Sequence, residues 1–318
     1  MSKFTSSQHN GSFMKGGQLG WFHDEGDPSG FFHTYDSFKV EGSPHGERKI
    51  HVFLPRDYEF NNHTYPMVYF NDGNTTFFSG GVGNSSWNVS RTLTELYKKQ
   101  EIVEVIVVAI YPVNRDYEYT SLCSNRGNPP GLIEYTDFIT NDLKGFIDTH
   151  YRTSCEVRQN MIIGSSNGGL AAFFTGCYKP DAFGFVSALS PSFWAGVDLS
   201  ENFPYIVKTD EKLKDSKLIE FVSDSLSKKK ERPSIYLDWG LVREGGLHNS
   251  SIEERAAARG REMSEILQKD YGYTLGSDLF VYEDKTGDHT EYSWSKRLPA
   301  ILKIFSNGRY KYENLVDI

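Results

Sequence analysis

The chain has 318 residues, a formal net charge of −8 at neutral pH and a pI of about 5.6. This length allows one large domain or two small ones with a substantial core. The acidic balance argues against a nucleic-acid partner, because phosphate binding depends on clustered Lys and Arg.

Two further features of the sequence bear on its location. No apolar stretch approaches the roughly 18 residues of a membrane span, and the N-terminus lacks the apolar core of a signal peptide. The three cysteines are widely spaced, which favours reduced thiols over a disulfide framework. We therefore expect no membrane association and a cytoplasmic protein, or a secreted one if a signal peptide has been removed.

The first elements lie near the N-terminus. Residues 1–30 are rich in Gly, Ser and polar side chains and predict a loosely ordered lead-in to one domain over 31–318. Two β-rich runs, 36–42 and 48–55, are separated by Ser43-Pro44-His45-Gly46. This turn composition predicts an antiparallel hairpin.

Beyond the hairpin, continuous apolar runs alternate with helical patterns, as is typical of strands covered on both faces. The expected strands are 65–72, 104–112, 159–164, 183–190, 234–240 and 278–288, and the expected helices are 87–100, 133–151, 167–180, 251–272 and 292–306. This alternation predicts an α/β architecture, with a mainly parallel sheet between layers of helices. Residues 198–232 interrupt it with equal numbers of acidic and basic side chains, which indicates a solvated face or a cap over the sheet.

The most informative motif is Gly164-Ser165-Ser166-Asn167-Gly168, at an expected strand-to-helix junction. A nucleophilic serine must be exposed, close to a base and close to oxyanion donors, and a sharp turn of this kind supplies all three. Glycines two residues before and after Ser166 permit the turn, whereas Ser165 has no such pair. The motif predicts Ser166 as the nucleophile; the alternative is a small-residue packing turn.

A histidine and an acid should follow the nucleophile. Only His248 and His289 lie beyond it, and His289, just past the last expected strand, is the predicted base, with a surface-loop histidine as the alternative. For the acid, Asp238 lies inside a strand and Glu244 in the loop after it. Glu253 and Glu254 begin a helix, where acids are favoured by the macrodipole regardless of function. We select Glu244, with Asp238 left open.

Oxyanion donors are expected from two backbone amides. Asn167 begins the helix after the nucleophile, and its N–H points at developing negative charge. The loop after residues 65–72 supplies the second donor, where Gly73 allows the backbone to bend inward and Asn74 provides the N–H.

An ordered set of segments resembles one family. The set comprises "YPMVYFNDGN", "IVVAIYPVNRDYEYT", "GSSNGG", "ALSPSFW", "YLDWG" and "GDHTEYSW". Over about residues 36–306 the chain resembles the esterase D and enterochelin esterase-like "putative esterase" family of α/β-hydrolases, which includes feruloyl esterase modules and mycolyltransferases.

The resemblance implies roles for individual residues. Ser166 is the expected nucleophile, His289 the base and Glu244 the acid, with Asn167 and Asn74 forming the oxyanion hole. Arg115 is expected at the substrate mouth, and Trp87, Trp194 and Trp294 either line the acyl or alcohol pocket or belong to the core. At the acid position, family members commonly carry Asp, or Glu one residue earlier, and some use a Ser-His dyad.

The leading hypothesis is a serine carboxylic-ester hydrolase that forms an acyl-enzyme on Ser166. It requires no metal or organic cofactor, and its only expected partner is a small-molecule ester. Transfer of the acyl group to a sugar or thiol, by the same triad, is the enzymatic alternative, and a non-catalytic binding protein with the same fold is the other. The choice among feruloyl, acetyl-sugar, siderophore and thioester substrates stays open, as does the oligomeric state.

Overall fold

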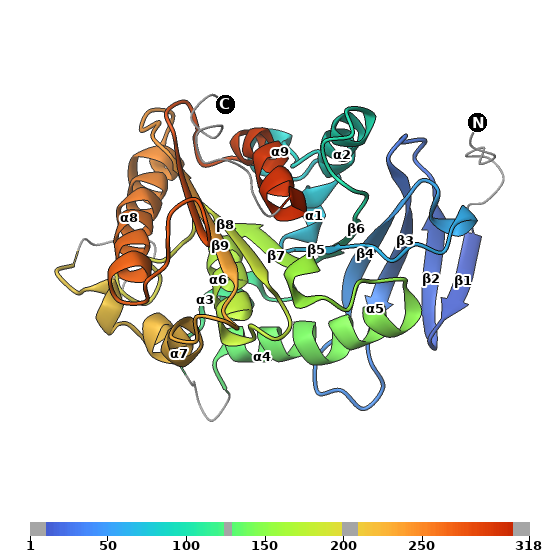
Figure 1. Cartoon of the computed structure of the whole chain (residues 1–318), viewed down its shortest axis with the longest axis horizontal. Helices are drawn as coiled ribbons and strands as arrows, with labels where there is room; N and C mark the ends of the chain where they lie inside the picture. The colour runs from blue at the N-terminus through green and yellow to red at the C-terminus, as the bar shows by residue number, and fades with distance from the viewer. Residues whose placement is uncertain (1–10, 124–128, 199–208, 308–318) are drawn as a thin grey trace.

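The computed structural model describes residues 11–123, 129–198 and 209–307, which build one ten-stranded sheet with helices on both faces (Figure 1). Along the sheet the strands follow the order β1-β2-β3-β4-β6-β5-β7-β8-β9-β10. Their bounds are β1 (Gly11–Lys15), β2 (Gln18–His23), β3 (Gly30–Phe38), β4 (Arg48–Pro55), β5 (Met67–Phe70), β6 (Ile106–Ile110), β7 (Asn160–Ser165), β8 (Phe185–Leu189), β9 (Ser234–Gly240) and β10 (Leu279–Asp284).

The parallel part of the sheet consists of the strands that read as continuous apolar runs. β6, β5, β7, β8, β9 and β10 pair in parallel, and every residue of β5, β6, β7 and β8 is buried. Strands covered on both faces need no polar alternation. β1 to β4 pair antiparallel with one another, and β4 pairs antiparallel with β6. The predicted mainly parallel sheet with an antiparallel N-terminal part is confirmed.

The N-terminal part differs from the sequence-based expectation in two ways. The first arm of the hairpin is β3 at Gly30–Phe38, not 36–42. The segment expected to be loosely ordered holds the hairpin β1–β2, whose strands are joined by Gly16 and Gly17 with φ of 54° and 77°. Two consecutive glycines with positive φ match the tight turn that a two-residue hairpin requires. The polar composition of the surrounding segment concealed this turn signal.

The helices form two layers, one on each face of the sheet. Their bounds are α1 (Gly73–Thr76), α2 (Val89–Lys98), α3 (Arg115–Thr120), α4 (Gly131–Asp137), α5 (Lys144–His150), α6 (Asn167–Tyr178), α7 (Lys217–Leu226), α8 (Glu254–Lys269) and α9 (Glu291–Asn307). Side chains of α2 and α9 pack with one face of the sheet, and those of α4 to α8 pack with the other. Figure 1 shows α2 and α9 across the sheet from α4 and α5. Within the described ranges, no helix combines the length and apolar content that a bilayer crossing needs.

The charged segment 198–232 contributes a helix to one of these layers. Its residues 199–208 lie outside the described part of the chain, but α7 packs on α6 through the rings of Phe221 and Phe174, whose centroids lie 5.8 Å apart. The Ser225 hydroxyl donates to the carbonyl of Cys177, also in α6. In the described part of this segment, α7 therefore has its apolar side against α6, and the charged side chains of Lys217 and Glu220 are exposed.

Two buried histidines lie among the antiparallel strands. His51 Nδ1 is 2.6 Å from Thr34 Oγ1, and its Nε2 is 3.1 Å from the Tyr111 hydroxyl. His33 Nδ1 is 3.1 Å from the Tyr151 hydroxyl. Burial, assisted by the charge of a nearby lysine, lowers the pKa of each histidine to about 3. Both are therefore neutral in the folded protein at neutral pH.

These histidines predict a pH dependence of stability. Their folded pKa of about 3 lies below the ordinary 6.5, so their contribution is complete above pH 6.5 and is lost as pH falls toward 3. Each should reduce the free energy of unfolding by up to about 1.4 kcal/mol per pH unit in that window. Urea unfolding of wild type and His51→Gln at pH 7 and pH 5 measures it, with exposed His63→Gln as control. An identical pH slope in wild type and His51→Gln would contradict the assignment.

Candidate active site

Ser166 occupies a sharp turn between β7 and α6. Its backbone has φ 55° and ψ −124°, a conformation that non-glycine residues rarely adopt. A Cβ added to Gly164 would lie 2.3 Å from the Gly168 carbonyl oxygen, and one added to Gly168 would lie 2.7 Å from Asp72 Oδ2. Both glycines are therefore required by close approach, as the motif predicted.

His289 lies beside this serine. It follows β10 in the turn that leads into α9, and its Nε2 is 2.9 Å from Ser166 Oγ. Its backbone N–H donates to Asn249 Oδ1 at 3.0 Å. The ring meets the Trp294 ring edge to face, with centroids 5.1 Å apart. Three contacts therefore hold His289 in place: its backbone hydrogen bond to Asn249, its ring contact with Trp294 and its hydrogen bond to Ser166.

The carboxylate opposite the other ring nitrogen belongs to Glu253, not to Glu244. Glu253 Oε2 pairs with His289 Nδ1 in a short hydrogen bond, and the Glu253 side chain is 0% exposed. Glu244 is exposed in the loop after β9, and its carbonyl accepts from Asn249 Nδ2. Asp238, the other candidate, is buried and lies 3.0 Å from Arg297 Nε. The selection of Glu244 is therefore corrected by the geometry.

The local backbone explains why the acid lies farther along the chain than expected. Residues His248–Glu253 form a π-helical segment, and α8 begins directly after it. The acid therefore arrives at the start of a helix rather than in the loop that leaves the strand. Helical spacing was the available signal: Glu253 shares a face with Ala256, Ala257 and Gly260, all buried.

The charge on Glu253 is stabilised although its side chain is buried. Burial acts to raise its pKa, but hydrogen bonds from His289 and from the Gly240 N–H, together with the positive charge of Arg297, hold the pKa below its usual range. The carboxylate is therefore ionised at neutral pH and can fix the tautomer of His289 with the proton on Nδ1.

The two expected oxyanion donors lie on helix starts. Asn167 is the first residue of α6, so its N–H has no partner within the helix. Asn74 is the second residue of the short helix α1, which follows β5. Asn71 Nδ2 donates to the Gly168 carbonyl at 2.8 Å and ties the end of β5 to the first turn of α6. The two segments that carry these amides are therefore held together.

Arg115 is bound to Asp72 in the same region. Its Nε and one terminal nitrogen donate to the two carboxylate oxygens of Asp72 at 2.7 and 2.8 Å. Asp72 has φ 55°, occupies the position before α1 without a side-chain capping hydrogen bond, and lies against Gly168. The Arg115 side chain is 39% exposed. Arg115 therefore braces the loop that carries Asn74 while one side of it faces solvent.

The three tryptophans expected at the pocket are buried. Trp87 stacks on Trp294 with ring centroids 5.9 Å apart, and the Trp294 Nε1–H donates to Ser190 Oγ at 3.0 Å. Trp194 lies after β8, where its Nε1 has no hydrogen-bond partner among the described residues. Trp294 contacts the candidate base, and Trp87 packs against Trp294. Both belong to the core beneath the site rather than to an open surface.

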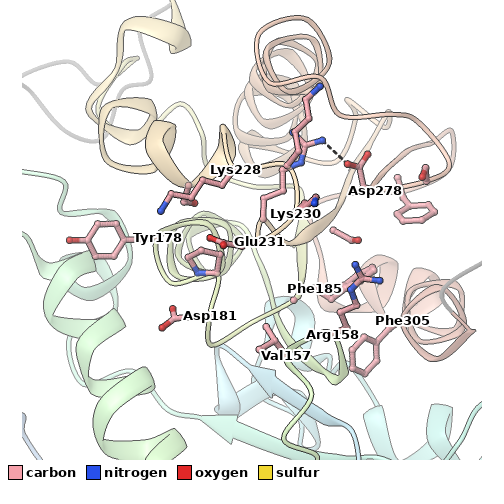
Figure 2. Close-up of a pocket in the computed structure, with 18 of the residues that line it drawn as sticks. Val157, Arg158, Tyr178, Asp181, Phe185, Lys228, Lys230, Glu231, Asp278 and Phe305 are labelled. Carbon is pink, nitrogen blue, oxygen red and sulfur yellow. Dashed lines mark hydrogen bonds and ion pairs between the residues drawn. The ribbon is translucent and has the colours of Figure 1, made fainter.

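A cavity of about 1010 Å³ lies elsewhere (Figure 2). It is lined by residues that precede the parallel strands, such as Arg158 before β7 and Asp278 before β10, whereas Ser166 and His289 follow those strands. Basic Lys228 and acidic Glu231 both contribute to its wall (Figure 2). The cavity therefore lies at the N-terminal ends of the parallel strands and is not part of the candidate active site, which lies at their C-terminal ends.

Comparisons with known proteins identify what this chain resembles. An uncharacterized protein, YbbA of Bacillus subtilis (strain 168), is 28% identical over 155 residues, which are 47% of this chain and 58% of that protein. A ferulic acid esterase structure superposes with TM-score 0.60 at 19% identity, covering 89% of this chain and 99% of the other. The siderophore hydrolase EstA from Aspergillus nidulans gives TM-score 0.59 at 20% identity, with 85% and 93% covered.

At this level of identity the two structures show a common fold. The family described as "Putative esterase" matches residues 42–305, a range that includes β4 to β10, the turn at Ser166 and the loop of His289. This chain has the α/β-hydrolase fold, spans little more than half the length of the curated relative it matches, and belongs to the family described as "Putative esterase".

Proposed function

We propose that this protein hydrolyses small carboxylic esters through an acyl-enzyme on Ser166, with His289 as general base and Glu253 as the acid. The observation that carries the proposal is one continuous line of hydrogen bonds. It runs from Ser166 Oγ to His289 Nε2 over 2.9 Å, and from His289 Nδ1 to the buried carboxylate of Glu253. Nucleophile, base and orienting acid in this order are the arrangement that activates a serine hydroxyl.

The reaction would take place in two halves. In the first, Ser166 Oγ attacks the ester carbonyl carbon and its proton moves to His289 Nε2; the same proton then goes to the leaving alcohol, so that an acyl-serine forms. In the second, His289 takes a proton from water, which attacks the acyl carbon; the acyl–Oγ bond then breaks, the proton passes from His289 Nε2 to Ser166 Oγ, and the carboxylic acid is released. Glu253 stabilises the imidazolium in both halves and stays ionised.

The backbone amides of Asn167 and Asn74 would stabilise the oxyanion of each tetrahedral intermediate. Asn167 at the start of α6 also has the positive end of the helix dipole behind it. Such preorganised donors commonly contribute about 10²- to 10³-fold in kcat each. The brace of Arg115 on Asp72 would keep the Asn74 segment in position during the reaction.

Substitution of the nucleophile tests the proposal directly. Ser166→Ala should lower turnover of p-nitrophenyl acetate and butyrate by about 10⁴-fold or more, abolish the burst of p-nitrophenol and prevent labelling by a fluorophosphonate, because the attacking oxygen is gone. Mass mapping should place the wild-type label on Ser166. The neighbouring variant Ser165→Ala is the control and should keep the label. A label on any other residue would contradict the proposal.

The two acids provide a matched pair of variants. Glu253→Gln preserves shape but removes the charge beside His289, and should lower kcat by about 10²- to 10⁴-fold. Glu244→Gln removes an exposed carboxylate that has no contact with His289, and should leave kcat within about twofold. Steady-state kinetics with p-nitrophenyl butyrate compares them. The reverse result would return the role of acid to Glu244.

A substitution of Arg115 distinguishes two roles of this side chain, positioning of the Asn74 segment and binding of a substrate carboxylate. If it positions the Asn74 segment, Arg115→Lys should lower kcat for neutral and anionic esters alike, by about tenfold, because a lysine cannot make the two parallel hydrogen bonds to Asp72. If it receives a substrate carboxylate, KM should rise for anionic esters alone. Kinetics on paired neutral and carboxylated phenyl esters, extended to feruloyl and siderophore esters, measures which parameter moves.

A further inference from the structure

Ser190 lies directly beneath the carboxylate of Glu253. It follows β8, is fully buried, and its Oγ is 2.8 Å from Glu253 Oε1. That oxygen is the one turned away from His289, and it also accepts the Gly240 N–H. The hydroxyl therefore occupies the far side of the carboxylate, where it touches neither His289 nor any surface that a substrate could reach.

The surroundings of Ser190 fix the direction of its hydrogen bond. Trp294 Nε1 is 3.0 Å from Ser190 Oγ, and one terminal nitrogen of Arg297 is 3.4 Å from it. Indole and guanidinium groups donate and cannot accept. Ser190 Oγ must therefore accept from both, and its single proton is left for Glu253 Oε1. The hydroxyl is polarised toward the carboxylate by an indole and by a positive charge.

The backbone at Ser190 is also held in an unusual shape. Its φ is 41°, in the left-handed region that a serine seldom adopts, and its N–H donates to the Asp238 carbonyl at 2.8 Å. Strained residues persist where the surrounding structure determines their position, and they cluster at functional sites. Here the strain places the hydroxyl between Trp294 and Glu253.

We propose that Ser190 is a positioning residue for catalysis, which fixes Glu253 against His289, and that Trp294 acts through Ser190 by fixing the direction of its hydroxyl. This inference rests on the proposed function, since it gives Ser190 a role in the rate of the esterase reaction. Loss of the hydroxyl leaves Glu253 Oε1 with the Gly240 N–H alone, so the carboxylate gains freedom to rotate away from Nδ1. The resulting loss would appear in kcat, because Ser190 touches no substrate.

Ser187 in β8 and Ser190 directly after β8 provide a matched pair of variants. Ser187 is also fully buried, three residues before Ser190, and within the described chain its Oγ has no hydrogen-bond partner. Ser190→Ala should lower kcat for p-nitrophenyl butyrate about tenfold, with KM within about twofold, whereas Ser187→Ala should change neither. The low-field proton resonance of His289 Nδ1–H should shift or broaden in Ser190→Ala and stay unchanged in Ser187→Ala.

Trp294→Phe tests whether Trp294 acts through the Ser190 hydroxyl or only by packing against His289. It keeps an aromatic ring beside His289 but removes the indole N–H, and should lower kcat about threefold. If Trp294 acts through Ser190, the double variant should be no slower than Ser190→Ala. If the losses of kcat in the two single variants add in the double variant, Trp294 does not act through Ser190. If Ser190→Ala changes neither kcat nor the proton resonance, Ser190 is not a positioning residue. Should Ser190→Ala fail to fold, Trp294→Phe alone decides by the same two readouts.

Different measurements test the role of Ser190 and the esterase mechanism. A wild-type protein that neither turns over esters nor accepts a fluorophosphonate label would refute the esterase mechanism. The proton resonance is measured on the resting protein and needs no turnover, so it still reports whether Ser190 holds Glu253 against His289. An active wild type with an unaffected Ser190→Ala would leave the esterase mechanism standing and remove Ser190 from it.

Discussion

The candidate site depends on one constraint, the tight passage of the chain from β7 into α6. At Ser166 the backbone has φ 55°, and its N–H is bound to the Leu189 carbonyl of the neighbouring strand at 2.9 Å. Because the turn is this tight, the serine side chain is lifted out of the sheet and the Asn167 amide begins a helix beside it. The same tightness leaves no room for a Cβ at Gly164, and the Asp72 side chain packed against the turn leaves none at Gly168. One backbone geometry therefore positions the proposed nucleophile, the helix dipole and the proposed oxyanion donor.

Behind this turn lies a set of buried charges whose ionisation states differ. Burial raises the pKa of Asp238 to about 7, although Arg297 acts to lower it, whereas Glu253 is held below its usual range by His289, Gly240 and Arg297. Arg297 is itself buried between Asp238 and Asp284. An acidic partner for an imidazolium must be ionised at working pH. The environment thus favours Glu253 over Asp238 for that task, and carboxylates of different environment commonly take different roles.

The candidate site and the cavity of Figure 2 lie at opposite ends of the parallel strands. Ser166 and His289 follow those strands, where α/β proteins commonly bind their ligands, while the cavity is lined by residues that precede them. The antiparallel N-terminal strands extend the sheet still farther from the site, and β1 to β3 precede the region that the family match covers. Met14 and Leu19 pair across the β1–β2 hairpin with exposed side chains. The part of the chain that the family model matches therefore begins with β4 and contains the whole candidate site.

The sequence alone determined the order of β4 to β10 and of the helices α2, α4 to α6, α8 and α9, the turn at Ser166 and the candidate base His289. These features rest on local patterns: apolar runs, glycine spacing and the position of a histidine after a strand. Gly16 and Gly17 also carried a local turn signal, but the polar composition around them obscured it. Tertiary structure decided the proposed acid: helical spacing places Glu253 on a buried face, but only the folded π-helical segment brings its carboxylate to His289. It also decided that Ser190, Trp294 and Arg297 converge beneath that acid, since residues more than a hundred positions apart meet there only after the sheet has formed.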